Sequence, residues 1–282
     1  MRVAIFSDVH GNLNALEAVL VAIKEKAPDL IVFAGDLCLG GAYPSECVAL
    51  LRAESIAAIE GYTDTLLNND PLLDTNLEQA RKRHEPFDDN LRDWTWAALT
   101  PADRAWLRTL PAQRRVSPTT FPQDDLFVVH ANPKNMVTAI LPDEASQEAI
   151  WNEVRQPNSG SEMRHLLSDL FVGVLAYGHL HIPGSRHWQH LHLANISSVS
   201  LAQDGDPRAK YGLLTWERRA GWRLEQQYVT YNIEAEVEAL AQKQPPAWSQ
   251  LADSLRSGNL QKLPDLYPEP ISGHISAMTV VS

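Results

Sequence analysis

Aspartate and histidine side chains follow four apolar segments of this sequence, each at the point where the segment ends. The segments cover residues 3–6, 30–34, 127–129 and 171–177, and their composition predicts short β-strands. Ligands of open α/β sheets bind beyond the carboxyl ends of the strands, so these positions favour a functional site. The candidate residues are Asp8, His10, Asp36, His130, His179 and His181.

Metal binding is the chemistry that these six residues favour. Asp8 and His10 are two positions apart, and side chains with that spacing in an extended chain face the same side. The same spacing separates His179 from His181. Asp36 carries two carboxylate oxygens and can bridge two ions. One such residue alone is more often structural, but imidazole nitrogens and carboxylate oxygens as a set suit transition metals.

Alternating strands and helices must position these residues. In the first sixty residues the apolar strands alternate with segments of helical spacing at 13–26 and 43–53, which is typical of parallel βαβ units. The charged, tryptophan-rich stretch that begins at residue 65 predicts a helical insertion or cap. A further helix is expected over 143–155, strands dominate again over 171–230, and two short helices are expected after them.

Composition limits the class of protein. The chain has 282 residues, 44% of them hydrophobic, which is enough to bury a full core. Its formal net charge of −11 disfavours broad nucleic-acid binding, which depends on lysine and arginine. The two cysteines cannot form a disulfide framework by themselves. No apolar run approaches the roughly 20 residues of a membrane span, and no signal peptide is recognisable, so we expect a cytoplasmic protein.

The candidate residues also carry a resemblance to a known family. In their order along the chain they resemble the motifs of the calcineurin-like metallophosphoesterases, over about the first 230 residues. The segment 195–211 is similar to the small bacterial and archaeal branch of that family. The motifs are Asp8-Val9-His10, Gly35-Asp36, His130 and Gly178-His179-Leu180-His181.

We therefore expect an α/β fold, a four-layer α/β/β/α sandwich of two mixed sheets flanked by helices. A metallophosphoesterase domain is expected over residues 1–245, with the helical insertion at 65–115 inside it. Residues 246–282 form a C-terminal extension in this prediction. The protein is expected to be a monomer or a homodimer.

The resemblance implies two divalent ions, drawn from Mn, Fe, Zn, Ni or Co and bridged by Asp36. It assigns catalysis to Asp36, Asp8 and His10. The implied function is metal-dependent hydrolysis of a small phosphoester or nucleotide, as a phosphatase or phosphodiesterase, by metal-activated water. The implied ligands of the first ion are Asp8, His10, Asp36 and His181. Those of the second are Asp36, His130 and His179.

The sequence departs from the family pattern after the third predicted strand. Gly61-Tyr62-Thr63-Asp64 stands where the family has Gly-Asn-His-Asp or a close variant. Tyr62 thus replaces an asparagine ligand of the second ion, and it either binds the ion itself or lines the pocket. Thr63 replaces a histidine thought to protonate the leaving group, which predicts slower turnover and a bias toward good leaving groups. Asp64 either orients the loop or is a solvated turn carboxylate.

Three residues are candidates for substrate contacts: Asn12, Thr63 and Arg208. Asn12 either orients the substrate or caps the helix that follows it. Arg208 either binds a phosphate or forms a structural salt bridge. Two other functions remain open at this point. One is a metal-binding regulatory protein with weak catalysis, which the departures at Tyr62 and Thr63 favour. The other is a nuclease, which the acidic charge disfavours.

Overall fold

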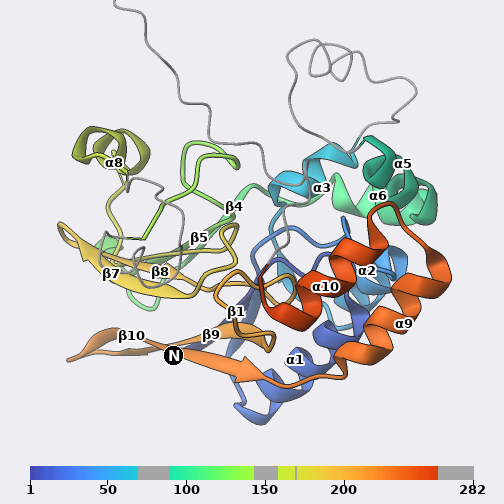
Figure 1. The fold of residues 1–282 in the computed structure, drawn as a ribbon. Helices are drawn as coiled ribbons and strands as arrows, with labels where there is room; N and C mark the ends of the chain where they lie inside the picture. Colours follow the sequence, from blue (N-terminus) through green and yellow to red (C-terminus); the bar gives the residue numbers. More distant parts are fainter. Residues whose placement is uncertain (69–88, 143–157, 169, 260–282) are drawn as a thin grey trace, which may run out of the picture.

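Two five-stranded sheets pack face to face between helices (Figure 1). The computed structural model describes residues 1–68, 89–142, 158–168 and 170–259. In the N-terminal sheet the strand order is β10-β9-β1-β2-β3, and in the second sheet it is β4-β5-β6-β8-β7. Each sheet contains parallel and antiparallel pairs, as between β1 and β2 and between β1 and β9. The predicted sandwich of two mixed sheets is confirmed.

The strands of the N-terminal sheet are β1 (Arg2–Phe6), β2 (Leu30–Phe33), β3 (Ala57–Ala58), β9 (Ala209–Glu217) and β10 (Gly221–Val229). Those of the second sheet are β4 (Gln113–Val116), β5 (Leu126–Val129), β6 (Val174–Tyr177), β7 (Gly184–Trp188) and β8 (Leu191–Asn195). The helices are α1 (Leu13–Glu25), α2 (Pro44–Ala53), α3 (Tyr62–Leu66), α5 (Asp89–Ala98), α6 (Pro101–Leu107), α8 (Gly160–Leu167), α9 (Ile233–Lys243) and α10 (Trp248–Ser257), with a short 3-10 turn at Pro122–Asp124.

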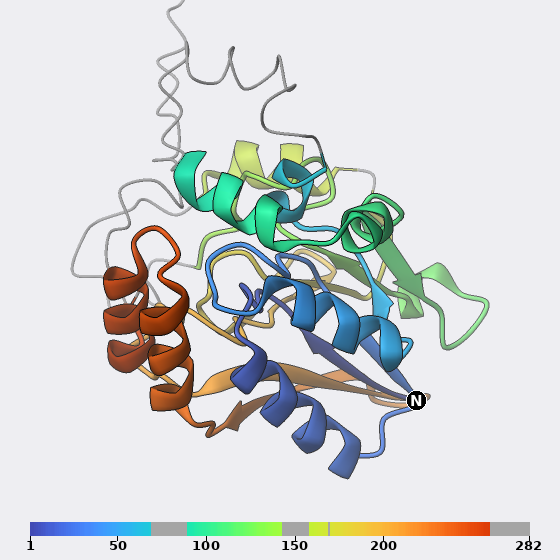
Figure 2. The same ribbon diagram turned by 90° about the vertical axis from the view of Figure 1, so that its right-hand side faces the viewer.

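Alternating side chains of the strands build the layers. In β1, Val3 and Ile5 face the core between the two sheets, whereas Ala4 and Phe6 face α1 and α2. The second sheet follows the same rule, with Val128 toward the inner core and its neighbours toward α8. Figure 2 shows α1 and α2 on one side of the N-terminal sheet and α9 and α10 stacked as a pair beside them.

Helix α1 has the features that its sequence predicts. Asn12 caps it, because the side-chain oxygen accepts the N–H of Ala15 at 2.9 Å. Its buried face carries Leu16, Val19 and Ile23 at helical spacing.

Among the residues described, no helix is both long and apolar enough to cross a membrane.

Strand β4 is an element that the sequence pattern does not predict. It lies at the edge of the second sheet and pairs antiparallel with β5.

The range 65–115, predicted as a helical insertion, contains the end of α3, all of α5 and α6, and the first residues of β4. Three sequence ranges lie outside the described residues in whole or in part: the helix expected at 143–155, residues 69–88 of the insertion, and the chain after residue 259.

Candidate metal centre

The loops that follow β1, β2, β5 and β6 bring the six candidate residues together in two clusters. Within each cluster the candidate ligand atoms lie within 4.8 Å of one another. All six side chains are buried, and the largest exposed fraction is 7%, at His179. The first cluster consists of Asp8, His10 and His181, and the second of Asp36, His130 and His179.

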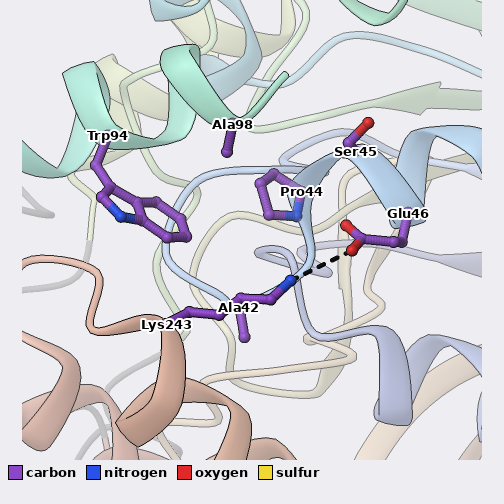
Figure 3. Close-up of a pocket in the computed structure, with 7 residues that line it drawn as sticks. All are labelled: Ala42, Pro44, Ser45, Glu46, Trp94, Ala98 and Lys243. Carbon is purple, nitrogen blue, oxygen red and sulfur yellow. Dashed lines mark hydrogen bonds and ion pairs between the residues drawn. The ribbon is translucent and has the colours of Figure 1, made fainter. Parts of the chain in front are cut away.

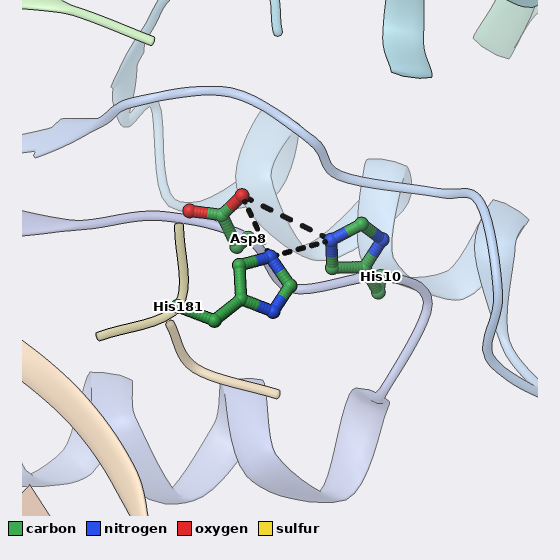
Figure 4. Close-up of side chains that lie close together, drawn as sticks. All are labelled: Asp8, His10 and His181. Atoms are coloured by element: carbon green, nitrogen blue, oxygen red, sulfur yellow. Dashed lines mark hydrogen bonds and ion pairs between the residues drawn. The ribbon is translucent and has the colours of Figure 1, made fainter. Parts of the chain in front are cut away.

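In the first cluster three ligand atoms converge (Figure 4). Nε2 of His181 lies 3.2 Å from Oδ1 of Asp8, and Nε2 of His10 lies 3.9 Å from the same oxygen. The two Nε2 atoms are 3.2 Å apart. His10 also reaches toward the second cluster, since its Nε2 is 4.0 Å from Oδ2 of Asp36.

Hydrogen bonds behind the first cluster fix the tautomers of its histidines. Nδ1 of His10 donates to the carbonyl of Leu39 at 2.7 Å, and Nδ1 of His181 donates to the carbonyl of Leu201 at 2.6 Å. In the neutral rings the Nε2 atoms then carry lone pairs that face each other, which is repulsive unless a cation lies between them. The donor set therefore fits a metal ion, and a carbonyl behind each ligating imidazole is typical of metal sites.

The second cluster follows the same pattern. Nδ1 of His130 donates to the carbonyl of Ala34 at 3.0 Å, and Nε2 of His179 donates to the carbonyl of Val137 at 3.0 Å. The remaining ring nitrogens, Nε2 of His130 and Nδ1 of His179, are 3.2 Å apart. Oδ2 of Asp36 lies 3.3 Å from Nε2 of His130. This donor set also fits a divalent ion.

In Asp8 and in Asp36, one carboxylate oxygen accepts a backbone N–H and the other faces the histidines. Oδ2 of Asp8 accepts the N–H of His179 at 3.0 Å, which leaves Oδ1 toward the histidines. Oδ1 of Asp36 accepts the N–H of Thr63 at 2.8 Å, which leaves Oδ2 between His130 and His10. Oδ2 of Asp36 thus faces a histidine of each cluster.

The backbone reaches this arrangement through left-handed turns. Asp8 (φ 57°) and His10 (φ 49°) have positive φ, and so do His179 (φ 70°) and His181 (φ 58°). The predicted extended chain at these pairs is therefore wrong. Asp8 and His10 still lie in one cluster, whereas His179 and His181 lie in different clusters. Asp36 also has positive φ, 64°. Aspartate and histidine tolerate this region better than most residues, and such conformations are common at functional sites.

Burial and close charges shift the pKa values of the centre. Burial lowers the pKa of His130, but the Asp36 carboxylate, the Asp8 charge and the Ala34 carbonyl together outweigh burial and raise that pKa to about 10. Burial lowers the pKa of His179 to about 4, and the charge of His130 adds to this effect. Burial alone would raise the pKa of Asp8, but His181 and His130 hold it below its usual value. The ion-free protein therefore holds a proton at His130 near neutral pH.

Asp64 and two glycines, Gly35 and Gly61, hold the backbone around Asp36 in place. The Asp64 carboxylate accepts backbone N–H groups at 2.8–2.9 Å, among them that of Asp36. Burial and the Asp36 charge raise the pKa of Asp64 to about 7. A Cβ added at Gly61 would lie 2.2 Å from Oδ1 of Asp36, and one added at Gly35 would lie 2.6 Å from the Gly61 backbone. The structure thus assigns Asp64 to orienting the loop.

The other predicted site residues occupy different places. Tyr62 begins α3, next to Thr63, and its carbonyl accepts the hydroxyl of Thr65 at 2.6 Å. The buried hydroxyl of Thr63 has no hydrogen-bond partner among the described residues. Asn12 caps α1, and its amide also donates to Ser200 and Tyr231.

Arg208 forms a salt bridge rather than reaching either cluster. Its guanidinium binds both carboxylate oxygens of Asp206 and lies over the ring of Tyr228, 4.7 Å from the centroid. The sequence does not reveal the backbone carbonyls that accept hydrogen bonds from the histidine rings, which belong to Ala34, Leu39, Val137 and Leu201. Every residue has a carbonyl, so no sequence signal distinguishes these.

One pocket of about 530 Å³ lies apart from the clusters, at the N-terminus of α2 (Figure 3). Pro44, Trp94 and Ala98 line its apolar side, and Lys243 lies opposite them. None of the six candidate ligands lines it. The pocket is therefore not the metal centre.

The fold and the two clusters are typical of the metallophosphoesterase class of proteins. The chain belongs to the calcineurin-like phosphoesterase superfamily, since it matches the calcineurin-like phosphoesterase superfamily domain over residues 1–219. The resemblance predicted from the motifs is thereby confirmed. Among known proteins it is similar to the uncharacterized protein MJ0912 of Methanocaldococcus jannaschii, at 25% identity over 255 residues, which cover 87% of this chain and 94% of that protein.

Two solved structures share the fold. One is a metallophosphoesterase from Sphaerobacter thermophilus, with a TM-score of 0.67 and 23% identity. The other is the hypothetical protein PH1004 from Pyrococcus horikoshii OT3, with a TM-score of 0.73 and 17% identity. In both comparisons the match covers 92% of this chain and 99% of the other. At these identities the likeness shows the fold alone.

Proposed function

We propose that this protein is a metal-dependent hydrolase of small phosphoesters or nucleotides that uses a dinuclear metal centre. The observation that carries the proposal is the pair of buried clusters with Asp36 between them. Mixed imidazole and carboxylate donors suit Mn, Fe, Zn, Ni or Co. Divalent ions held there would supply Lewis-acid stabilisation of the phosphoryl oxygens and favour attack by water.

The chain itself contributes positioning. Backbone N–H groups of Thr63 and His179 hold the carboxylates of Asp36 and Asp8, so each aspartate presents one fixed oxygen. Such preorganisation reduces the rearrangement needed when charge develops in the transition state. Tyr62 precedes Thr63 directly, and we retain it as a candidate ligand of the second ion.

Among the predicted substrate contacts, Thr63 has the best support. Its hydroxyl has no hydrogen-bond partner among the described residues, and its backbone N–H holds Asp36, so Thr63 is a candidate next to the centre with an unused donor. Asn12 and Arg208 already bind other groups of the protein. No histidine occupies position 63, so we expect faster hydrolysis of esters with good leaving groups.

The test combines elemental analysis with hydrolysis of one generic phosphomonoester and one generic phosphodiester in added Mn²⁺. We expect two ions per chain, hydrolysis of at least one ester, and loss of both ion binding and hydrolysis in Asp36→Ala. The matched control is Asp253→Asn on the exposed face of α10, which should behave as the wild type. Full Mn²⁺-dependent activity in Asp36→Ala would contradict the proposal.

The same test separates the alternatives. A regulatory metal-binding protein, which the replacement at Thr63 favours, would bind ions and hydrolyse neither ester. The preferred ester distinguishes a phosphatase from a phosphodiesterase.

A further inference from the structure

The two histidines of the first cluster depend on two leucine carbonyls for their orientation. His10 donates from Nδ1 to Leu39 and His181 donates from Nδ1 to Leu201, at 2.7 and 2.6 Å. Leu39 belongs to the loop between β2 and α2, and Leu201 to the loop between β8 and β9. Moving either carbonyl would therefore turn a candidate ligand.

The side chains of both leucines lie in one hydrophobic cluster with the C-terminal helix pair. Leu39 is fully buried and Leu201 is 3% exposed. Helices α9 and α10 pack against each other as a pair (Figure 2). They contribute most of the remaining members of this cluster, among them Val237, Leu240, Leu251 and Leu255. Leu39 and Leu201, whose carbonyls accept from the two histidines, thus pack against helices that lie outside both sheets.

Polar contacts join α9 to the loop that follows Leu39. Oε1 of the buried Glu236 accepts the N–H of Ala42 at 3.2 Å. At the end of the same helix, Lys243 bonds to Glu46 at 3.2 Å, a contact drawn in Figure 3. Its ammonium also lies 3.9 Å from the centroid of the Tyr43 ring. The loop is therefore fixed to α9 by a buried hydrogen bond as well as by apolar packing.

The end of α10 contacts the loop that follows Leu201. The N–H of Gly205 donates to the carbonyl of Gly258 at 2.9 Å. Gly258 ends α10 at a φ of 65°, and a Cβ added there would lie 2.6 Å from the carbonyl carbon of Asp206. Only glycine allows this close approach. Each of the two leucine loops thus has its own attachment to the helix pair.

The histidines of the second cluster donate to carbonyls of other residues. His130 donates to the carbonyl of Ala34, whose side chain lies in the core between the sheets. His179 donates to the carbonyl of Val137. Neither Ala34 nor Val137 belongs to the cluster that α9 and α10 form. The two clusters therefore differ in what holds their histidines.

We propose that the C-terminal helix pair, residues 233–258, positions the first metal cluster and not the second, through Leu39 and Leu201. This inference rests on the proposed metal centre and adds a role for the helices. Leu39 and Leu201 are positioning residues, because they act through His10 and His181. Loosening the helix pair should weaken one ion site selectively.

The test compares Leu255→Ala with Leu166→Ala. Leu166 is equally buried but lies in α8, on the outer face of the second sheet. Histidine side-chain NMR of the ion-free protein reports the Nδ1–H groups of His10, His181 and His130. In Leu255→Ala we expect the first two signals to shift or exchange faster, with that of His130 unchanged. In Leu166→Ala the signals of His10 and His181 should be unaffected.

Mn²⁺ binding provides the second readout. We expect about 10-fold weaker binding at one site in Leu255→Ala, as is typical when an outer contact of a metal ligand is lost. The other site and both sites of Leu166→Ala should keep wild-type affinity. If Leu255→Ala does not fold, Glu236→Ala serves instead, with Glu236→Gln as the conservative variant that restores an acceptor for Ala42.

The outcomes separate this inference from the proposed function. Equal loss at both sites, or no change in the His10 and His181 signals of a folded variant, would overturn the positioning role. A wild-type protein that hydrolyses no phosphoester would count against the proposed activity alone. The NMR comparison remains decisive in that case, because it requires neither bound ions nor turnover.

Discussion

The Asp64 carboxylate accepts the backbone N–H of Asp36 at 2.8 Å. A buried acid outside both clusters therefore holds Asp36 of the second cluster, whose Oδ2 also faces His10 of the first. The same carboxylate accepts the N–H groups of Leu37 and Gly61, each at 2.9 Å. Three backbone donors on one side chain fix the loop after β2 to the start of α3.

Replacing Asp64 with asparagine should disturb this arrangement. Asparagine keeps one oxygen, but its amide N–H₂ faces backbone donors, so at least one N–H loses its acceptor. We expect the free energy of unfolding to fall by about 1–3 kcal/mol, measured by urea denaturation, and Mn²⁺ content to fall with it. Asp253→Asn, at an exposed position, is the control. Wild-type stability and ion content in Asp64→Asn would refute the role.

Gly61 should not tolerate a side chain. A Cβ at this position would meet Oδ1 of Asp36 at 2.2 Å and the Asp36 backbone nitrogen at 2.3 Å. Gly61→Ala is therefore expected to displace Asp36 and to abolish binding of at least one ion, measured by elemental analysis. In Gly160→Ala the new Cβ meets only Arg164, at 3.6 Å, and both ions should be retained. Retention of both ions by Gly61→Ala would show that the loop can shift without affecting the centre.

Ion binding at the second cluster should release a proton. His130 has a pKa of about 10 in the ion-free protein, so it is protonated at pH 7 and must lose that proton to bind a metal. The apparent affinity for Mn²⁺ should therefore rise with pH between 7 and 10, by up to about tenfold per pH unit. Calorimetry in buffers of different ionisation enthalpy measures the release.

Two variants complete that experiment. His130→Ala should lose the proton release together with one ion, whereas His165→Ala, on the exposed face of α8, should change neither. A pH-independent affinity over this range would mean that His130 is neutral before the ion binds.

Thr63→Val should separate stability from activity. Removing a buried hydroxyl that has no partner leaves the free energy of unfolding unchanged or raises it by up to about 1 kcal/mol. If the hydroxyl contacts the substrate, kcat/KM should fall about tenfold. Thr109→Val, at an exposed position, controls for the substitution itself. Unchanged kcat/KM in Thr63→Val would remove Thr63 from the substrate site.

The sequence by itself determined the layers and the six candidate ligands. Segments such as Val3–Phe6 are apolar at every position, which predicts strands that are buried on both faces. Aspartate and histidine at the ends of such strands are local features that can be read directly. Within each sheet these residues converge because the carboxyl ends of parallel strands meet at one edge. The packing of the two sheets then brings His181 to Asp8 and His130 to Asp36.

Tertiary structure decided the rest. Strand β4 (Gln113–Val116) has little apolar pattern, and its pairing with β5 makes it a strand. The left-handed turns at Asp8 and His10 depend on hydrogen bonds to the loop after β2, at Gly35 and Asp36. These contacts join residues far apart in the chain.

The carbonyls that orient His10 and His181 are positioned only by tertiary packing. Helical spacing predicts α9 and α10, but it does not indicate that they pack against Leu39 and Leu201. A backbone carbonyl is the same at every position, so its role arises only when folding places it behind a histidine. The sequence specifies which side chains can bind a metal, and the packing of distant segments decides how they are held.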